Sequence, residues 1–274
     1  MPALDLLADW PVTAVSAAVV GPEGILAARG DTGGRYPLAS VTKPLAARAA
    51  QIAVEEQVVE LDTPAGPPGS TVRHLLAHTA GYAMNSGELL AQPGSRRVYS
   101  NYGFRVLAEV IAAQSGIEFG SYLTEAVFTP LGMSASRLDG DAAAAGYGAV
   151  STVSDLATFV TDLLRPRTVS AQMHAEATSV QFPGLPGVLP GFGMQRPNDW
   201  GLGFEIRAAK SPHWTGLANS PATYGHFGQS GTFLWVDPAR ELGLVVLTDR
   251  EFGEWATSLW PAISDEVLRD FAGH

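Results

Sequence analysis

The sequence predicts an α+β fold in which one β-sheet is built from both ends of the chain and a mainly helical region lies between them. Two apolar runs around a Pro/Gly turn open the chain, and alanine-rich helical segments fill its middle third. Further strand-like runs follow before a last helix. That order of elements fits one sheet shared by the two chain ends.

The opening runs, residues 12–20 and 25–28, are expected to form a hairpin around the Gly-Pro-Glu-Gly turn at 21–24. No lysine or arginine precedes Arg29, whereas a secretory signal needs a basic start. We therefore expect residues 12–20 to be a buried strand and the protein to be cytoplasmic. No apolar run reaches the length of a membrane span, so no membrane partner is expected.

The middle of the chain is expected to be helical because its segments combine high helix propensity with apolar residues on one face. Gly116 and the Thr129-Pro130 pair are typical stop signals for two of these segments. The five predicted helices are 45–56, 71–81, 102–115, 119–127 and 154–164.

The last third of the chain changes character. A Pro/Gly-rich stretch at 181–198 predicts a long loop, and the final segment, 255–271, predicts a helix interrupted near Pro261. A hairpin loop at 237–241 is expected to join the last two strands. The three predicted strands are 201–206, 232–236 and 242–248.

Composition narrows the function classes. Hydrophobic residues make up 46% and charged residues 16% of the 274 residues, which excludes a disordered chain. A formal charge of −10 argues against a nucleic-acid partner, which would need a basic face. Cysteine is absent and the six histidines show no paired ligand spacing, so neither thiol chemistry nor a metal or other cofactor is expected. The oligomeric state stays open.

Ser40 and Lys43 are the first residues that suggest chemistry. Positions i and i+3 share a helix face, so the hydroxyl and the amine can meet, and a desolvated lysine can accept the serine proton. Pro44 places the pair in a first helical turn, where the helix dipole favours negative charge near Ser40. A capping serine followed by a solvated lysine is the alternative. Lys43 and Lys210 are the only lysines of the chain, which weighs against that alternative.

Two further groups follow along the chain. Tyr99 could act as a base if a neighbouring ammonium lowers the pKa of its phenol, and Asn101 offers both a donor and an acceptor. A buried aromatic residue before a helix cap is the alternative for this pair. The segment 226–231 (HFGQSG) predicts a glycine-rich strand edge, where a backbone N–H can face an oxyanion and substrate can approach closely. Its alternative is a glycine-rich turn.

Together and in this order, the three groups resemble the motifs of the serine β-lactamase and penicillin-binding-protein superfamily. The Tyr-x-Asn and His-x-Gly forms resemble most closely its class C β-lactamase-like branch, which includes the family VIII esterases. Three more segments match that branch, at 75–81 (LLAHTAG), 128–133 (FTPLGM) and 150–156 (VSTVSDL).

The resemblance extends over residues 12–250 and implies a β-lactamase/transpeptidase-like fold. In that fold the sheet from both chain ends is antiparallel, and the terminal helices pack on it. It also implies one domain over residues 1–274, with a sheet part at about 1–38 and 199–274 and a helical part at about 39–198.

The resemblance implies that Ser40 is the nucleophile of an acyl-enzyme and that Lys43 and Tyr99 are its proton-transfer pair. The backbone amides of Ser40 and Gln229 would form the oxyanion hole, and Asn101 would contact the substrate or hold Lys43. The residues implied for substrate binding are Asn101, His226, Gly228 and Gln229.

Two departures from the family pattern bear on the substrate. At the position of His226 the family pattern has a permanent cation, whereas a histidine is expected to be only partly charged at neutral pH. Phe227 lacks the hydroxyl that would help hold a substrate carboxylate. Only residues 82–98 separate the Gly81 segment from Tyr99, which predicts an open pocket. We therefore predict hydrolysis of small neutral esters. The alternatives are a D-amino-acid amidase or D-Ala carboxypeptidase, a β-lactamase, or an inactive penicillin-recognising sensor module.

Overall fold

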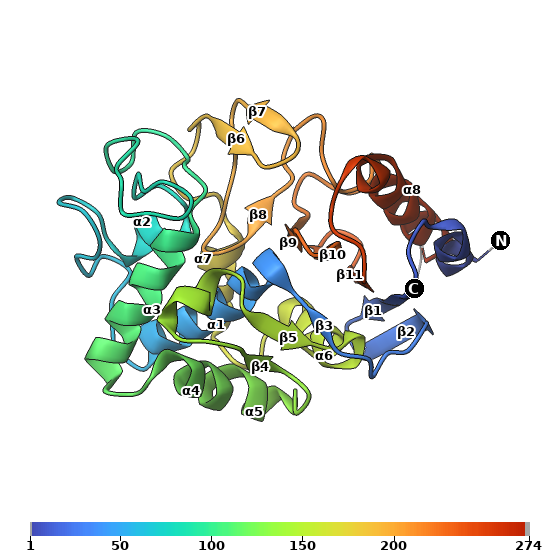
Figure 1. Cartoon of the computed structure of the whole chain (residues 1–274), viewed down its shortest axis with the longest axis horizontal. Coiled ribbons are helices and arrows are strands. Elements are labelled where there is room, and N and C mark those ends of the chain that lie inside the picture. Colours follow the sequence, from blue (N-terminus) through green and yellow to red (C-terminus); the bar gives the residue numbers. More distant parts are fainter. Residues whose placement is uncertain (1, 272–274) are drawn as a thin grey trace.

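A six-stranded antiparallel sheet occupies one half of the computed structural model, which describes residues 2–271 (Figure 1). Its strand order is β2–β1–β11–β10–β9–β8, and the N-terminal β1 sets Ala18 opposite Val245 of the C-terminal β11. The predicted sheet from both chain ends is therefore confirmed. Its strands are β1 Val15–Gly21, β2 Gly24–Arg29, β8 Glu205–Ile206, β9 Tyr224–Gly228, β10 Thr232–Asp237 and β11 Leu242–Thr248.

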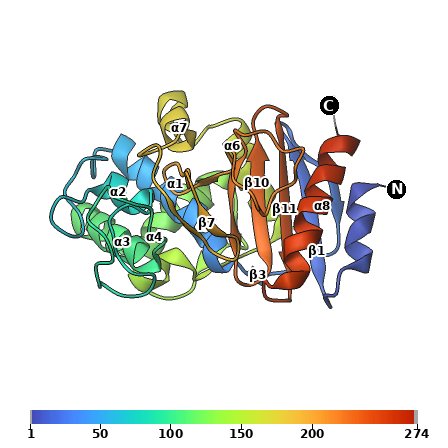
Figure 2. The ribbon, with the colours of Figure 1, turned by 90° about the horizontal axis from the view of Figure 1, so that it is seen from above.

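The central strands are apolar on both faces because the sheet separates two cores. Ala17, Trp235 and Val246 pack against the N-terminal 3₁₀-helix Ala3–Asp9 and the C-terminal α8 (Glu254–Asp270). Ala18 and Val245 belong to the other core, which includes α1 and α6. Figure 2 shows the two terminal helices on one side of the sheet and the helical half on the other. Burial on both sides explains why these strands are continuous apolar runs instead of alternating ones.

The helical region fills the other half of the molecule (Figure 1). Its helices are α1 Thr42–Glu55, α2 Val72–Leu76, α3 Asn101–Ser115, α4 Phe119–Leu123, α5 Thr129–Leu131, α6 Val153–Leu164 and α7 Ala171–Thr178. Two small sheets accompany them, one of β3 Tyr36–Pro37, β4 Arg137–Leu138 and β5 Ala149–Ser151, the other of β6 Gly187–Leu189 and β7 Gly193–Gln195.

Most predicted helices are confirmed, with shifted ends. α1 begins before residue 45 and takes Lys43 and Pro44 into its first turn. α3 ends at Gly116, which has the left-handed φ of 73° that favours glycine. The helix expected to stop at Thr129-Pro130 instead continues through a π-helical turn, Thr124–Phe128, into α5. Pro130 lies directly after the π-helical turn, in the first two residues of α5.

Three other expectations are corrected. Only Glu205–Ile206 of the predicted strand 201–206 pairs, because the chain first passes close to α1: a Cβ on Gly203 would lie 2.1 Å from the Cβ of Ala47. The predicted loop 181–198 contains the β6–β7 hairpin. α8 continues through Pro261 without interruption, and the carbonyl deprived of its N–H donor belongs to the exposed Thr257, where water is accessible. No described helix combines the length and apolarity needed to span a membrane.

Candidate active site

Ser40 lies on a short 3₁₀ turn, Ala39–Val41, directly before α1. Neighbouring elements hold this turn on both sides: the N–H of Leu38 donates to Ala149 O at 2.8 Å, and Thr232 Oγ1 donates to Leu38 O at 2.9 Å. Ala39 has a φ of 44°, a left-handed conformation that an L-residue adopts only under constraint. The candidate nucleophile is thus placed by strands β5 and β10 as well as by its own helix.

Lys43 lies one turn further along α1 and is fully buried. Its Nζ is 2.6 Å from Asn101 Oδ1, 2.8 Å from Gly146 O and 3.4 Å from Ser40 Oγ. No carboxylate pairs with it among the residues from 2 to 271, and burial holds the pKa of Lys43 well below its usual value. A neutral amine has two N–H groups and one lone pair. Asn101 and Gly146 take the two hydrogens, so the lone pair is left for the Ser40 hydroxyl.

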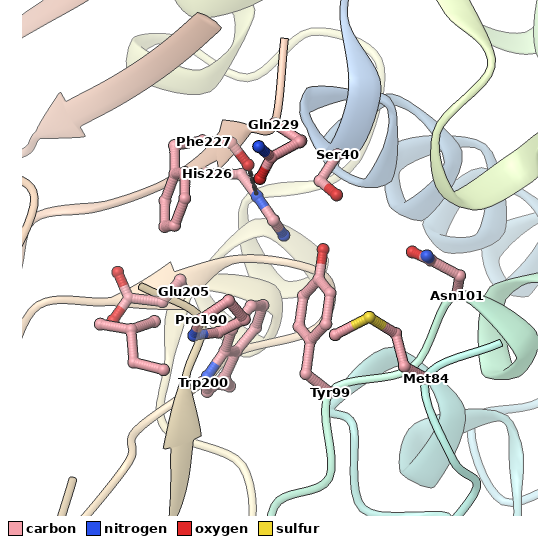
Figure 3. Close-up of a pocket in the computed structure, with 11 residues that line it drawn as sticks. Ser40, Met84, Tyr99, Asn101, Pro190, Trp200, Glu205, His226, Phe227 and Gln229 are labelled. Carbon is pink, nitrogen blue, oxygen red and sulfur yellow. Dashed lines mark hydrogen bonds between the residues drawn. The ribbon is translucent and has the colours of Figure 1, made fainter. Parts of the chain in front are cut away.

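Tyr99 lies just before α3, and its hydroxyl points toward Ser40 and His226 (Figure 3). Its ring packs at 4.6 Å from the buried His78 ring and lies 4.5 Å from Lys43 Nζ. Burial raises the pKa of the Tyr99 phenol, although a hydrogen bond with Ser40 lowers it. This direction contradicts the expected partial ionisation of Tyr99, so its hydroxyl remains protonated and able to relay a proton.

Asn101 is the first residue of α3. Its Oδ1 accepts from Lys43, and its Nδ2 donates to Asn85 Oδ1 at 2.8 Å. The oxygen and one of the two N–H groups of this amide are therefore occupied. Of the two roles considered for Asn101, the geometry favours holding Lys43.

His226 lies on β9 and faces the same cavity (Figure 3). Its Nδ1 is 2.7 Å from Phe227 O, an acceptor, so Nδ1 carries the hydrogen and Nε2 is the free acceptor. Nε2 is buried and has no hydrogen-bond partner among the described residues. Burial lowers the pKa of His226 to about 3. The expected partial charge at neutral pH is therefore wrong, and His226 is a neutral acceptor.

Phe227 points away from His226, into an aromatic cluster behind the cavity wall. Its ring centroid is 5.0 Å from that of Phe252 and 5.8 Å from those of Phe192 and Trp260. Only 9% of Phe227 is exposed, although it also lines the cavity. The residue is thus part of the core as well as part of the site.

Gly228 and Gln229 bring the end of β9 against the Ser40 turn. A Cβ on Gly228 would lie 2.3 Å from Leu38 O and 2.6 Å from Thr232 Oγ1, so only glycine allows this approach. Gln229 O accepts from the N–H of Phe252 at 2.8 Å, whereas the N–H of Gln229 has no hydrogen-bond partner within residues 2–271. That free donor beside Ser40 is available to an oxyanion.

These residues enclose a cavity of about 270 Å³ (Figure 3). Ser40, Tyr99, Asn101 and His226 are its polar groups near the nucleophile. The rest of its lining is mostly apolar: Met84, Leu189, Pro190, Trp200 and Phe227. The three predicted motifs thus meet in one cavity, although 186 sequence positions separate Ser40 from His226. Among the described residues no group of three or more His, Asp or Glu side chains is arranged to hold a metal.

Glu205 also lines the cavity, and the sequence motifs do not identify it. Its buried carboxylate accepts from Trp214 Nε1 at 3.0 Å, from His213 Nε2 at 2.9 Å and from Lys210 Nζ. Burial alone would raise the pKa of Glu205, but His213 and Lys210 outweigh it and hold this pKa well below its usual range. Because the chain has only two lysines, their scarcity could have drawn attention to the buried Lys210 as well as to Lys43.

Comparisons with known proteins agree with this fold. A β-lactamase from Mycobacterium bovis with a crystal structure is 71% identical, the match covers 98% of this chain and 99% of that one, and the TM-score is 0.98. EstCE1, a hydrolase with promiscuous acyltransferase activity, has the same fold at 18% identity, with 97% and 96% of the two chains covered and a TM-score of 0.79.

A relative from Salmonella heidelberg, provisionally named a D-alanyl-D-alanine carboxypeptidase, is 24% identical over 205 residues. The match covers 58% of this chain and 46% of that protein, so the chain spans about half the length of the curated relatives it matches. The sequence pattern of one protein family, described as Beta-lactamase, matches residues 12–267. Because that match covers nearly the whole chain, this protein belongs to the β-lactamase family.

Proposed function

We propose that this protein is a serine hydrolase that acts through an acyl-enzyme on Ser40 and hydrolyses small neutral carboxylic esters. The observation that carries the proposal is the contact of Ser40 Oγ with Lys43 Nζ at 3.4 Å, on a lysine that is fully buried and has no carboxylate partner among the described residues. Burial keeps the amine neutral, and a neutral amine can take the serine proton.

Lys43 is proposed as the base. It takes the Ser40 proton as Oγ attacks the ester carbonyl carbon, and the N–H groups of Ser40 and Gln229 stabilise the resulting oxyanion. Collapse breaks the bond to the leaving alcohol, which receives its proton from Lys43 through the Tyr99 hydroxyl. Water then attacks the acyl-enzyme by the same steps in reverse, which releases the acid and restores Ser40.

The choice of neutral esters rests on His226 and Phe227. A neutral imidazole and a phenyl ring provide neither a cation nor a hydroxyl for a carboxylate beside the reacting bond. An ester needs no such anchor. The cytoplasmic location remains a prediction.

β-Lactam hydrolysis is the second candidate because the 71%-identical Mycobacterium bovis protein is described as a β-lactamase. Amide hydrolysis next to D-alanine is the third, from the name of the Salmonella relative. A panel of p-nitrophenyl esters, D-amino-acid p-nitroanilides and nitrocefin separates the three substrate classes. We expect turnover of the esters to exceed that of the other two.

The nucleophile is tested by labelling with a fluorophosphonate probe followed by peptide mapping. We expect the label on Ser40 and its loss, together with essentially all ester turnover, in Ser40→Ala. A label on another serine, or an active Ser40→Ala protein with the wild-type fold, contradicts the proposal.

A further inference from the structure

A second cavity of about 460 Å³ adjoins the catalytic one and shares Met84, Tyr99 and Pro190 with it. It lies between the loop at residues 82–98 and the β6–β7 hairpin. The two segments are tied where the N–H of Arg97 donates to Pro186 O at 2.9 Å. Figure 1 shows the hairpin beside the loop that precedes α3. A substrate bound at Ser40 can therefore extend directly into this groove.

The groove gathers apolar side chains that are open to solvent. Of the ten large apolar side chains exposed among the described residues, four line it: Met84, Leu90, Val188 and Met194, each between 45% and 53% exposed. Single exposed apolar residues are ordinary, but a contiguous group beside an active site marks a binding surface. An apolar chain is the ligand that such a surface fits.

Two guanidinium groups border the same groove. Arg196 forms no hydrogen bond or ion pair with any described residue, and the side chain of Arg96 donates only to Leu90 O, at 3.2 Å. Neither has a carboxylate partner within residues 2–271, in a chain whose formal charge is −10. Guanidinium groups bind carboxylates and phosphates in fork geometry. The groove thus has an apolar wall and a positively charged border.

We propose that this groove is the subsite for the distal part of the substrate, an unbranched apolar chain that ends in an anionic group held by Arg96 and Arg196. The inference rests on the proposed ester hydrolysis at Ser40 and names its substrate class more closely. A neutral ester at Ser40 and an anionic group on the same substrate are compatible. The anion lies at the far end of the chain, while the neutral His226 faces the reacting bond.

The test compares two esters with the same eight-carbon acyl chain, p-nitrophenyl octanoate and mono-p-nitrophenyl suberate, which differ by a terminal carboxylate. p-Nitrophenyl acetate is the short reference. We expect kcat/KM to be higher for both long esters than for acetate, and highest for the suberate. Arg96→Gln with Arg196→Gln should lower kcat/KM for the suberate by about three- to tenfold, the range for two exposed charge pairs, and leave acetate unchanged.

Two control variants separate charge from apolar contact. Arg240→Gln removes the same charge from the exposed β10–β11 turn and should alter none of the three rates. Val188→Ser should lower kcat/KM for both long esters and spare acetate. A wild-type protein that hydrolyses acetate through Ser40 but shows no preference for the suberate overturns the subsite and leaves the proposed function intact. A preference that survives loss of both arginines also overturns it.

Binding provides a measurement that does not depend on turnover. Titration calorimetry of the Ser40→Ala protein with octanoate should detect binding that weakens by about three- to tenfold when Arg96 and Arg196 are changed to glutamine. Equal binding by the two proteins, or no binding, contradicts the subsite even if esters prove not to be substrates.

Discussion

At the scale of single residues, burial sets the protonation states of the site. It lowers the pKa of Lys43, raises that of Tyr99 and lowers that of His226 to about 3. Each shift favours the neutral form of its side chain. In the proposed mechanism the amine acts as the base and the phenol relays the proton, so Lys43 and Tyr99 have different roles.

Lys43→Met tests the role of the amine. The substitution keeps an unbranched apolar stem in the buried position but removes the base, so we expect ester turnover to fall by about 10²–10⁴-fold. Turnover is measured with p-nitrophenyl acetate, and a thermal melt verifies the fold. Retention of a tenth of the rate, a loss of only about 1.4 kcal/mol, would contradict a base at Lys43.

Tyr99→Phe removes only the hydroxyl that points toward Ser40. If Tyr99 relays the proton to the leaving alcohol, kcat for an alkyl ester such as ethyl acetate, whose alkoxide needs that proton, should fall by about 10²-fold or more, while the ring contacts with His78 and the melting temperature remain. Unchanged kcat in a folded variant would leave Tyr99 with a packing role alone.

Phe227→Thr tests whether the fold tolerates a hydroxyl side chain at position 227 in place of the phenyl ring. Because its ring packs against Phe252, Trp260 and Phe192, the change opens a cavity in the core. We expect the free energy of unfolding in urea to fall by about 3 kcal/mol, near the lower end of the range for removing a buried aromatic ring. Leu217→Thr, at a side chain that is 85% exposed, is the control and should change it by less than about 0.5 kcal/mol. Equal stability of the two variants would mean that Phe227 is only a lining residue.

At the scale of elements, the site depends on how strand β9 meets the turn before α1. Gly228 of β9 allows the close approach because it has no side chain, and Thr232 of the next strand, β10, donates a hydrogen bond to Leu38 O. The free N–H of Gln229 follows directly after this contact. The distance between the two proposed oxyanion-hole donors is therefore set by a glycine contact.

Gly228→Ala should damage catalysis because its Cβ would lie 2.3 Å from Leu38 O and push β9 away from Ser40. Loss of one oxyanion donor costs about 10²–10³-fold in kcat, and we expect an effect of that size on p-nitrophenyl acetate hydrolysis. Gly33→Ala is the matched control, since a Cβ there would meet nothing closer than 3.6 Å. Equal kcat for the two variants would show that the contact does not position the oxyanion hole.

At the scale of the whole molecule, the site lies where the sheet meets the helical half, and the groups buried there make stability depend on pH. Burial lowers the pKa of His226 to about 3, that of His174 to about 4 and that of His78 well below its usual 6.5. Below pH 6.5 the unfolded chain takes up protons at these positions and the folded chain does not. The free energy of unfolding must therefore fall as the pH falls, and Lys43 acts in the same direction.

We expect urea denaturation to show this loss between about pH 6.5 and about pH 4.5, with up to about 1.4 kcal/mol per pH unit from each neutral histidine. Glu205 contributes in a lower window, because its lowered pKa stabilises the fold above the usual glutamate value of 4.5 and that stability is lost as the pH falls below it. His226→Gln should reduce the change in the free energy of unfolding with pH, above about pH 4.5, by up to about 1.4 kcal/mol per pH unit, the contribution of one histidine. A slope that does not change in this variant would mean that His226 is protonated in the folded protein.

The sequence by itself determined the sheet from both chain ends, the helical middle, the family motifs and the residues expected around Ser40. Apolar periodicity and turn residues predict the helices and strands because these are local patterns. The Ser-x-x-Lys spacing predicts that Ser40 and Lys43 meet because it spans one helical turn. The assignment of residues 1–274 to a single domain, and the roles of the site residues, stay predictions.

Only the tertiary structure decided the charge states and the cavity walls. His226 is neutral because distant segments bury it, and Phe227 belongs to the core because α8 and the loop before it pack on β9. The groove bordered by Arg96 and Arg196 likewise joins segments far apart in the chain. Burial is a property of the packed molecule, so no local pattern reports it.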